Sequence, residues 1–193
     1  MELVFASHNE NKVNEVRKIL PNNFTIISLN DLNFYEEIPE NKNTIEGNST
    51  FKANFIYKKF KLNVFADDTG LEITALNDLP GVKSARYAGP EKDSKKNLNK
   101  VLNDLKGIDL RNARFKTVIS LIYSGKLNLF EGIIYGEITR HKIGNGGFGY
   151  DTIFKPENYS KTFGEMSSKQ KNKISHRAIA INKLKNFLRK VYD

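Results

Sequence analysis

The chain has 193 residues, of which 39% are hydrophobic and none is cysteine, and its formal net charge is +9. This length and apolar content predict one domain spanning residues 1–193 with a core of its own, while the lack of cysteine excludes disulfides, thiolate metal sites and cysteine nucleophiles. Because no apolar run approaches the roughly 18 residues of a membrane-spanning helix and the first residues lack a signal-peptide core, we expect a cytoplasmic protein whose basic charge attracts anionic ligands.

The first third of the chain shows strands alternating with helices. A short apolar strand at residues 3–6 precedes a polar turn and an amphipathic helix. A second strand is expected at residues 24–29, and a second helix runs from about residue 44 to residue 60. The apolar run 64–66 predicts another short strand, which we expect to end in a turn at residues 67–70.

The rest of the chain continues this alternation and adds a hairpin. Ser94 is expected to cap a third helix. Two long β-like runs, 113–123 and 127–138, flank a Ser-Gly-Lys turn and predict a hairpin. The last helix carries one apolar stripe, made of Ile174, Ala178, Ile181, Leu184, Leu188 and Val191. Together these elements predict an α/β domain with a mixed sheet.

A polar cluster lies at the first strand-to-helix turn and contains Ser7, Asn9, Lys12 and Glu15. The N-terminus of a helix offers unpaired N–H groups and a positive partial charge, and the hydroxyl, amide and ammonium groups beside it suit phosphate oxygens. Simple capping of the helix by Ser7 or Asn9 is the alternative interpretation.

Two adjacent aspartates, Asp67 and Asp68, follow the third strand, and Glu40 lies in an acidic loop before it. Neighbouring carboxylates repel one another, so burying them requires a cation or hydrogen-bond donors. The three histidines lie too far apart in sequence for a zinc motif, and oxygen ligands favour Mg²⁺ or Mn²⁺. A solvated turn is the alternative, and the pattern leaves open which aspartate acts as a base.

A glycine-rich segment at residues 144–149 contains the spacing G-x-G-x-x-G. It is not a dinucleotide-binding fingerprint, because Pro156 follows where a helix would be needed. Such a loop can approach a ligand closely, and either Phe148 or Tyr150 could stack on a base. An ordinary glycine-rich loop is the alternative.

A basic run with Lys169, Lys171, Lys173 and Arg177 leads into the last helix. Cations at a helix N-terminus oppose the helix dipole, and an anionic ligand would resolve that conflict. A solvated charged surface is the alternative. Since we find no Walker A sequence and no Ser-His-Asp triad, the basic donors, the carboxylates and the stacking loop together favour a nucleoside triphosphate site.

Five sequence blocks then occur in the order of a known family. They are Ser7-His8-Asn9-Glu10-Asn11-Lys12-Val13-Asn14-Glu15, Phe65-Ala66-Asp67-Asp68-Thr69-Gly70-Leu71, Pro80-Gly81-Val82-Lys83-Ser84-Ala85-Arg86-Tyr87-Ala88-Gly89, Gly146-Gly147-Phe148-Gly149-Tyr150-Asp151 and Ile174-Ser175-His176-Arg177. On these blocks the chain resembles the inosine/xanthosine triphosphate pyrophosphatase family, from Ser7 to the last helix. The resemblance implies an elongated mixed β-sheet with flanking helices, in two lobes with the nucleotide cleft between them.

The resemblance further implies a nucleoside triphosphate pyrophosphatase that hydrolyses ITP, dITP and XTP to the monophosphate and pyrophosphate. It implies a homodimer and a requirement for Mg²⁺, with Mn²⁺ as a substitute. Asp68 would orient or deprotonate the attacking water. Glu40 would share the metal ion with Asp68, although Glu37 or Glu46 could replace Glu40. The substrate contacts would come from Ser7, Asn9, Lys12, Lys52, Thr69, Phe148, Gly149, Tyr150, Asp151, Lys171, His176 and Arg177.

Two other functions stay open at this point. A related nucleotide pyrophosphatase with a different base preference would use the same phosphate and metal groups. A basic nucleic-acid-binding module would use the lysine-rich C-terminal part and exposed aromatic side chains, but it leaves the Asp67-Asp68 pair unexplained. We therefore expect a purine nucleoside triphosphate as the partner, and neither a nucleic acid nor a membrane.

Overall fold

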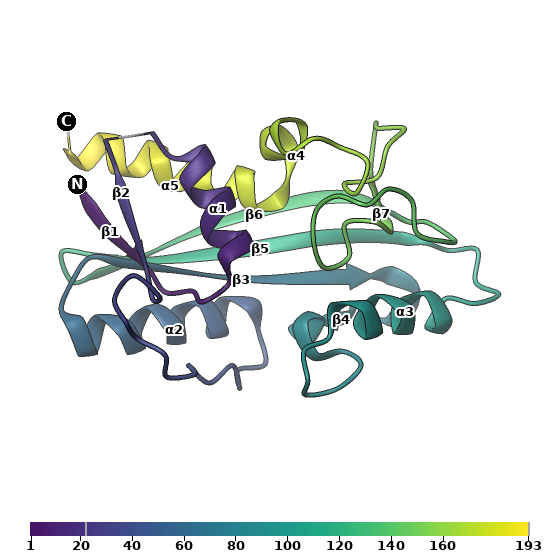
Figure 1. Cartoon of the computed structure of the whole chain (residues 1–193), viewed down its shortest axis with the longest axis horizontal. Coiled ribbons are helices and arrows are strands. Elements are labelled where there is room, and N and C mark those ends of the chain that lie inside the picture. Colours follow the sequence, from purple (N-terminus) through teal and green to yellow (C-terminus); the bar gives the residue numbers. More distant parts are fainter. Residues whose placement is uncertain (22, 193) are drawn as a thin grey trace. The chain divides into compact units, whose positions relative to one another are not determined.

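The structure is a computed structural model that describes residues 1–21 and 23–192 (Figure 1). Its helices and strands are, in chain order, β1 (Glu2–Phe5), α1 (Glu10–Ile19), β2 (Thr25–Ser28), α2 (Ile45–Phe60), β3 (Val64–Ile73), β4 (Leu79–Gly81), α3 (Ser94–Asp104), β5 (Asn112–Tyr123), β6 (Lys126–Ile138), β7 (Phe154–Pro156), α4 (Ser168–Ile174) and α5 (His176–Tyr192). Two short 3₁₀ helices, η1 (Thr74–Leu76) and η2 (Ser84–Arg86), flank β4.

The described strands form a mixed sheet in the order β2-β1-β3-β5-β6-β7, with β4 paired to β3. Strand β1 runs parallel to both β2 and β3. Strand β4 is antiparallel to β3, and β7 is antiparallel to β6. The predicted α/β class with a mixed sheet and flanking helices is therefore confirmed.

The chain forms two compact units, and neither is continuous in sequence. Unit 1 comprises Met1–Asp68, Thr117–Gly132 and Arg177–Asp193, and unit 2 comprises Thr69–Lys116 and Ile133–His176. Each unit is described by itself below. The expectation of one domain over residues 1–193, and that of a nucleotide cleft between two lobes, both stay predictions.

Unit 1 buries β1 on both of its faces. Leu3 and Phe5 pack with residues of α1 and α5, whereas Val4 and Ala6 pack with residues of α2. Within this unit, α1 and α5 lie on one side of β1 and α2 lies on the other (Figure 1). This arrangement explains why residues 3–6 are all apolar instead of alternating with polar residues, since a parallel strand covered by helices on both sides has no solvent face.

Unit 2 has one core, built between α3, the strands of this unit and the loops around β7. Its buried members are Leu71, Ile73, Leu98, Val101, Leu105, Ala113, Phe115, Ile138, Tyr150, Ile153, Phe154, Phe163 and Met166. In β3 and β5 these core residues occur at every second position, as expected for strands with one buried face.

The predicted hairpin is confirmed, with β5 and β6 joined at Ser124 and Gly125. Both residues have positive φ, 48° and 76° respectively. Two consecutive positive φ values are characteristic of the tight turns that match the right-handed twist of a β-hairpin. The amide of Ser124 also donates to the side chain of Asn63 at 3.0 Å, which fixes the turn within unit 1.

The predicted turn at residues 67–70 is wrong. Strand β3 does not end at Ala66 but continues to Ile73, so that both aspartates lie in the middle of a strand. A run of Asp, Asp, Thr and Gly is typical of turns when the aspartates are exposed. Here both aspartates are buried, and their charges are compensated by groups from distant parts of the chain, as described below.

Two details of the predicted helices also differ. Asp93, not Ser94, caps α3, because its side chain accepts hydrogen bonds from the amides of Lys95 and Lys96 at 2.8 and 2.9 Å. The apolar stripe of the last helix is shorter than expected. Ile174 belongs to α4 and packs in the core of unit 2, and Val191 is 43% exposed.

Among residues 1–21 and 23–192, we find no helix with the length and apolar content needed to cross a bilayer.

Candidate active site

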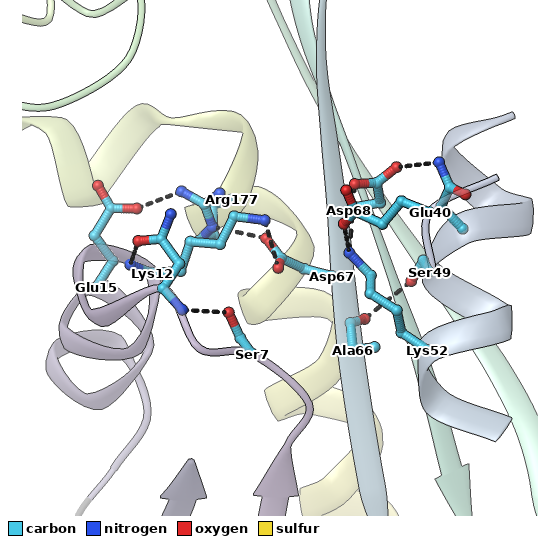
Figure 2. A network of polar contacts seen from close by, with 12 residues as sticks. Ser7, Lys12, Glu15, Glu40, Ser49, Lys52, Ala66, Asp67, Asp68 and Arg177 are labelled. Atoms are coloured by element: carbon cyan, nitrogen blue, oxygen red, sulfur yellow. Dashed lines mark hydrogen bonds and ion pairs between the residues drawn. The ribbon is translucent and has the colours of Figure 1, made fainter. Parts of the chain in front are cut away.

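The side chains of Asp67 and Asp68 point to opposite faces of β3 (Figure 2). Successive residues of a strand alternate between its two faces, so the two carboxylates are neighbours in sequence without facing one another. Both are buried, with exposed fractions of 2% and 7%. Each therefore needs its own partners, and each obtains them from a different set of elements.

Asp67 lies between two cations. One carboxylate oxygen accepts from Nζ of Lys12 at 2.9 Å, and the other accepts from Nε of Arg177 at 3.1 Å (Figure 2). Arg177, in the first turn of α5, is itself 2% exposed and also pairs with Glu15 of α1. Burial opposes ionisation of Asp67, but Lys12 and Arg177 outweigh it and hold the pKa of this carboxyl well below its ordinary value.

Helix α1 delivers Lys12 to Asp67 because its first turn is capped. Asn9 is the N-cap residue, and its side chain accepts from the amide of Lys12 at 3.2 Å. The hydroxyl of Ser7 accepts from the amide of Asn9, also at 3.2 Å. The capping interpretation is therefore confirmed for Asn9, while phosphate binding by Ser7, Asn9 and Lys12 stays a prediction. His8, between them, contacts the carbonyl oxygen of Phe34 through Nε2 at 2.8 Å.

Asp68 faces helix α2. One of its oxygens lies 3.5 Å from Nζ of Lys52, and Lys52 also pairs with Glu40 at 2.7 Å (Figure 2). The other oxygen accepts from the side-chain amide of Asn48 at 3.2 Å. Burial raises the pKa of Asp68, and the nearby Lys52 and Lys12 only partly offset this effect. Burial by itself would lower the pKa of Lys52, but Asp68 and Glu40 outweigh it and raise that pKa.

Helix spacing explains how α2 reaches this carboxylate. Asn48 and Lys52 are four residues apart and so lie on one face of the helix. Between them, the buried hydroxyl of Ser49 donates to the carbonyl oxygen of Ala66 at 2.9 Å, one residue before Asp67 (Figure 2). This hydrogen bond fixes the position of α2 along the direction of β3.

The donor set of unit 1 fits a hard divalent cation only in part. The structure brings Glu40 and Asp68 together around the ammonium of Lys52. Within the described residues there is no group of three or more carboxylate or histidine side chains that could hold a metal ion. Magnesium sites commonly use one or two carboxylates and complete their shell with water and substrate phosphates. Glu40 and Asp68 are therefore suited to Mg²⁺ that arrives with a phosphorylated substrate.

In unit 2, the glycine-rich loop closes around a buried ion pair. Asp151 pairs with Lys171 of α4 at 2.7 Å, and it also accepts from the amide of Phe148 at 2.8 Å. The ammonium of Lys171 lies 4.6 Å from the centroid of the Phe148 ring. Gly147, with φ of 73°, is required here, since a Cβ atom would come within 2.1 Å of the Asp151 carboxylate. The loop is thus preorganised by its own contacts.

Of the two aromatic residues considered for base stacking, only Phe148 is not fully buried. Phe148 is half-buried, whereas Tyr150 is 6% exposed and belongs to the core of unit 2. The Tyr150 hydroxyl donates to the carbonyl oxygen of Ser84 at 2.8 Å, and burial raises its pKa. The substrate contacts predicted for Phe148, Gly149, Tyr150 and Asp151 stay predictions.

The lysine run does not crowd the N-terminus of the last helix, contrary to expectation. It forms a separate helix, α4, which begins with a capping box of Ser167 and Gln170. Lys171 and Lys173 lie in its last turn, where cations favour the helix dipole. The electrostatic conflict is therefore absent for Lys171 and Lys173, whereas Arg177 does lie in the first turn of α5, where Asp67 and Glu15 compensate its charge.

The remaining predicted site residues lie close to the unit boundaries in the chain. Thr69 is half-buried within β3. His176, 3% exposed, stacks on Phe115 in unit 2 with ring centroids 4.5 Å apart. Arg177 contacts Asp67 and Glu15. The predicted substrate contact of Thr69 and the base contacts of His176 and Arg177 stay predictions.

Three site-forming residues were not assigned a role from the sequence. Glu15 follows Lys12 by three positions and so shares its helix face, a signal that the spacing contains. Asn48 precedes Lys52 by four. Ser84, in the block that no chemistry explained, donates to the carbonyl oxygen of Gly81 at 2.6 Å and accepts from the amide of Leu71 at 2.9 Å. It therefore joins η2 to β3 and supports Tyr150.

The described residues thus form a mixed α/β sheet whose strand β3 carries one buried aspartate on each face, each beside basic side chains. The chain belongs to the Ham1 family, whose model matches residues 3–187. The resemblance to inosine/xanthosine triphosphate pyrophosphatases is thereby confirmed.

Named relatives match over almost the whole chain. A protein of Flavobacterium johnsoniae called dITP/XTP pyrophosphatase is 52% identical, over 97% of this chain and 98% of its own length. A Bacillus subtilis protein of the same name is 44% identical, over 97% and 96%. The solved structure of the Staphylococcus aureus Ham1 protein superposes with a TM-score of 0.88 at 40% identity, covering 99% of this chain and 100% of that one.

Proposed function

We propose that this protein hydrolyses ITP, dITP and XTP to the nucleoside monophosphate and pyrophosphate, and so removes deaminated purine nucleotides from the nucleotide pool. It is a nucleoside triphosphate pyrophosphatase, as its relatives named dITP/XTP pyrophosphatase indicate. The observation that carries the proposal is Asp68, a buried carboxylate with a raised pKa beside Lys52 and Glu40.

The chemistry requires water to attack the α-phosphorus of the triphosphate. A carboxylate with a raised pKa is a stronger base than an exposed aspartate, so Asp68 is suited to orient the water and to accept its proton. Lys52 and Lys12 would stabilise the negative charge that grows on the leaving pyrophosphate. Asp67 has a different task, because its two cations keep it ionised and unsuited to accept a proton.

We also propose a dependence on Mg²⁺, with Mn²⁺ as a substitute, held by Glu40 and Asp68. When bound, such an ion neutralises charge on the phosphate oxygens and favours departure of pyrophosphate. What supports this proposal is the hard oxygen donor set and the close approach of both carboxylates to the same ammonium group, at 2.7 and 3.5 Å.

The base would be read by the loop of unit 2. The Phe148 ring offers a face on which a base can stack, and stacking alone does not distinguish one base from another. Hydrogen-bond donors aimed at the 6-oxo group would reject adenine, since a site built on hydrogen bonds can discriminate by about 10⁴-fold or more. Backbone amides of this loop are the donors that we propose for this task.

We further propose a homodimer in the cytoplasm. Leu127 and Leu129 support a dimer, because they occupy alternate positions of β6 and are 46% and 51% exposed. The cytoplasm is the compartment in which nucleoside triphosphates are made and used. Light scattering after size-exclusion chromatography tests the dimer.

Pyrophosphate release from ITP, XTP, dITP, dUTP, GTP and ATP in the presence of Mg²⁺ tests the proposed reaction. We expect pyrophosphate from the first three and little from the others. A preference for another base would identify a related pyrophosphatase, whereas release of orthophosphate alone would refute the reaction. Salt-sensitive binding of oligonucleotides without hydrolysis would indicate the nucleic-acid-binding alternative.

A further inference from the structure

Asn48 contacts both the proposed base and the loop that carries Glu40. It lies on α2 and is 1% exposed. Its side-chain amide donates to Asp68 at 3.2 Å, and its side-chain carbonyl oxygen accepts from the backbone amide of Lys42 at 2.9 Å. Lys42 follows Glu40 by two residues, so one buried side chain links the two carboxylates of the site.

The chemistry of its partners determines the orientation of this amide. The backbone N–H of Lys42 can only donate, so the oxygen of Asn48 must face it. The NH₂ group is thereby directed at Asp68, whose carboxylate can only accept when it is ionised. A reversed amide would lose both hydrogen bonds, and therefore Asn48 has one stable orientation.

This orientation distinguishes the two oxygens of Asp68. Oδ2 is held by Asn48, while Oδ1 lies 3.5 Å from Nζ of Lys52, the group that also binds Glu40. A carboxylate held at one oxygen cannot rotate freely, so Oδ1 keeps its direction toward Lys52 and Glu40. Because the hydrogen bond between Asn48 and Asp68 is buried, it is stronger than a hydrogen bond on the surface, and its loss costs more free energy.

We propose that Asn48 is the positioning residue of Asp68, and that through Lys42 it also keeps the Glu40 loop in register with that carboxylate. The inference rests on the proposed function for its catalytic consequence, but not for its structural one. Groups that orient metal-binding or reacting carboxylates commonly change metal affinity or activity by about 10- to 100-fold when they are removed.

The test compares Asn48→Leu and Asn48→Ala with the control Asn54→Ala. Leu keeps the branched shape of the side chain and Ala adds no bulk, and both remove the hydrogen bonds, so that agreement between the two variants guards against an effect of misfolding in one of them. Asn54 lies on the same helix, and its amide donates to the backbone oxygen of Thr50 at 3.0 Å. Both Asn48 variants should lower kcat for ITP by about 10- to 100-fold with KM within about twofold, and Asn54→Ala should leave kcat unchanged.

Two further measurements separate positioning from general destabilisation. When an Asn48 variant is combined with Asp68→Asn, kcat should be no lower than in Asp68→Asn alone, because losses of kcat from substitutions that act through one group do not add. In crystal structures, the Asp68 carboxylate should rotate away from Lys52 in Asn48→Leu but not in Asn54→Ala. An unmoved Asp68, or additive losses of kcat, would overturn the inference.

The crystal comparison also keeps the two proposals apart. If the wild-type protein releases no pyrophosphate from ITP, the proposed function fails, while the orientation of Asp68 in Asn48→Leu still decides the role of Asn48.

Discussion

The two faces of β3 place two identical side chains in opposite electrostatic environments. On the face toward α1 and α5, Asp67 has a cation within 3.1 Å of each oxygen, and its pKa is lowered. On the face toward α2, Asp68 shares Lys52 with Glu40, and its pKa is raised. A carboxylate whose charge is fully compensated stabilises the fold, whereas one that is buried with too little positive charge retains the capacity to bind a proton or a cation.

Asp68→Asn should have the largest effect on the chemistry. We expect kcat for ITP to fall by about 10²- to 10⁴-fold, the usual contribution of a general base. The fold should persist, since the substitution removes a buried charge and keeps the shape. Pyrophosphate release and thermal unfolding measure the two effects, and turnover near that of the wild type would remove Asp68 from the mechanism.

Asp67→Asn should have the largest effect on the fold. It removes the carboxylate that pairs with both Lys12 and Arg177, although Arg177 keeps its ion pair with Glu15, and breaking a buried ion pair in this way typically costs about 3–5 kcal/mol. Urea denaturation measures the free energy of unfolding, which should drop much more than in Asp68→Asn. Equal stability of the two variants would contradict the division of roles between the two faces.

The pH dependence of stability should also separate the two aspartates. Because its folded-state pKa is lowered, Asp67 contributes stability above the ordinary value of 3.8, and this contribution is lost as the pH falls below that value. Asp68 has a raised pKa, so protonation on the acidic side instead relieves a destabilising charge. Below pH 3.8, the free energy of unfolding should therefore fall less steeply in Asp67→Asn than in the wild type. If the free energy of unfolding fell equally steeply in Asp67→Asn and in the wild type, Asp67 would not be the cause of the loss of stability in acid.

Ser49→Ala should have the smallest effect. It removes a single buried hydrogen bond between α2 and the carbonyl oxygen of Ala66, without touching either aspartate. We expect the free energy of unfolding to decrease by about 1 kcal/mol, measured by urea denaturation. A loss as large as that of Asp67→Asn would mean that the attachment of α2, and not the charge pairing, dominates stability around β3.

The sequence predicts most elements of this fold because their signals are local. Two long β-like runs predict the hairpin, apolar residues at helical spacing predict α2, and the turn residues Ser124 and Gly125 predict where β5 ends. Helix α4 is not among the predicted elements, because the lysine run is interpreted only as the segment that leads into the last helix. Yet Ser167 and Gln170, three residues apart, form a capping box that is recognisable from the sequence alone.

The error at residues 67–70 has a different cause. Whether two aspartates form a turn or continue a strand depends on partners that are remote in sequence, here Lys12 at a separation of 55 residues and Arg177 at a separation of 110. Local propensity does not contain that information. The acidic pattern predicts a role for Asp67, Asp68 and Glu40, and the family resemblance adds Lys52, but neither predicts their mutual distances, nor that Arg177 holds Asp67.

The alternation of β3 makes the spacing of the two acids inflexible. Inserting or deleting one residue between Val64 and Asp67 would turn each downstream side chain to the opposite face. Asp68, the proposed base, would then face the guanidinium of Arg177. Asp67, which holds the fold together, would face Lys52 of α2. Loops elsewhere can change length at little expense, but the interior of this strand admits substitutions only.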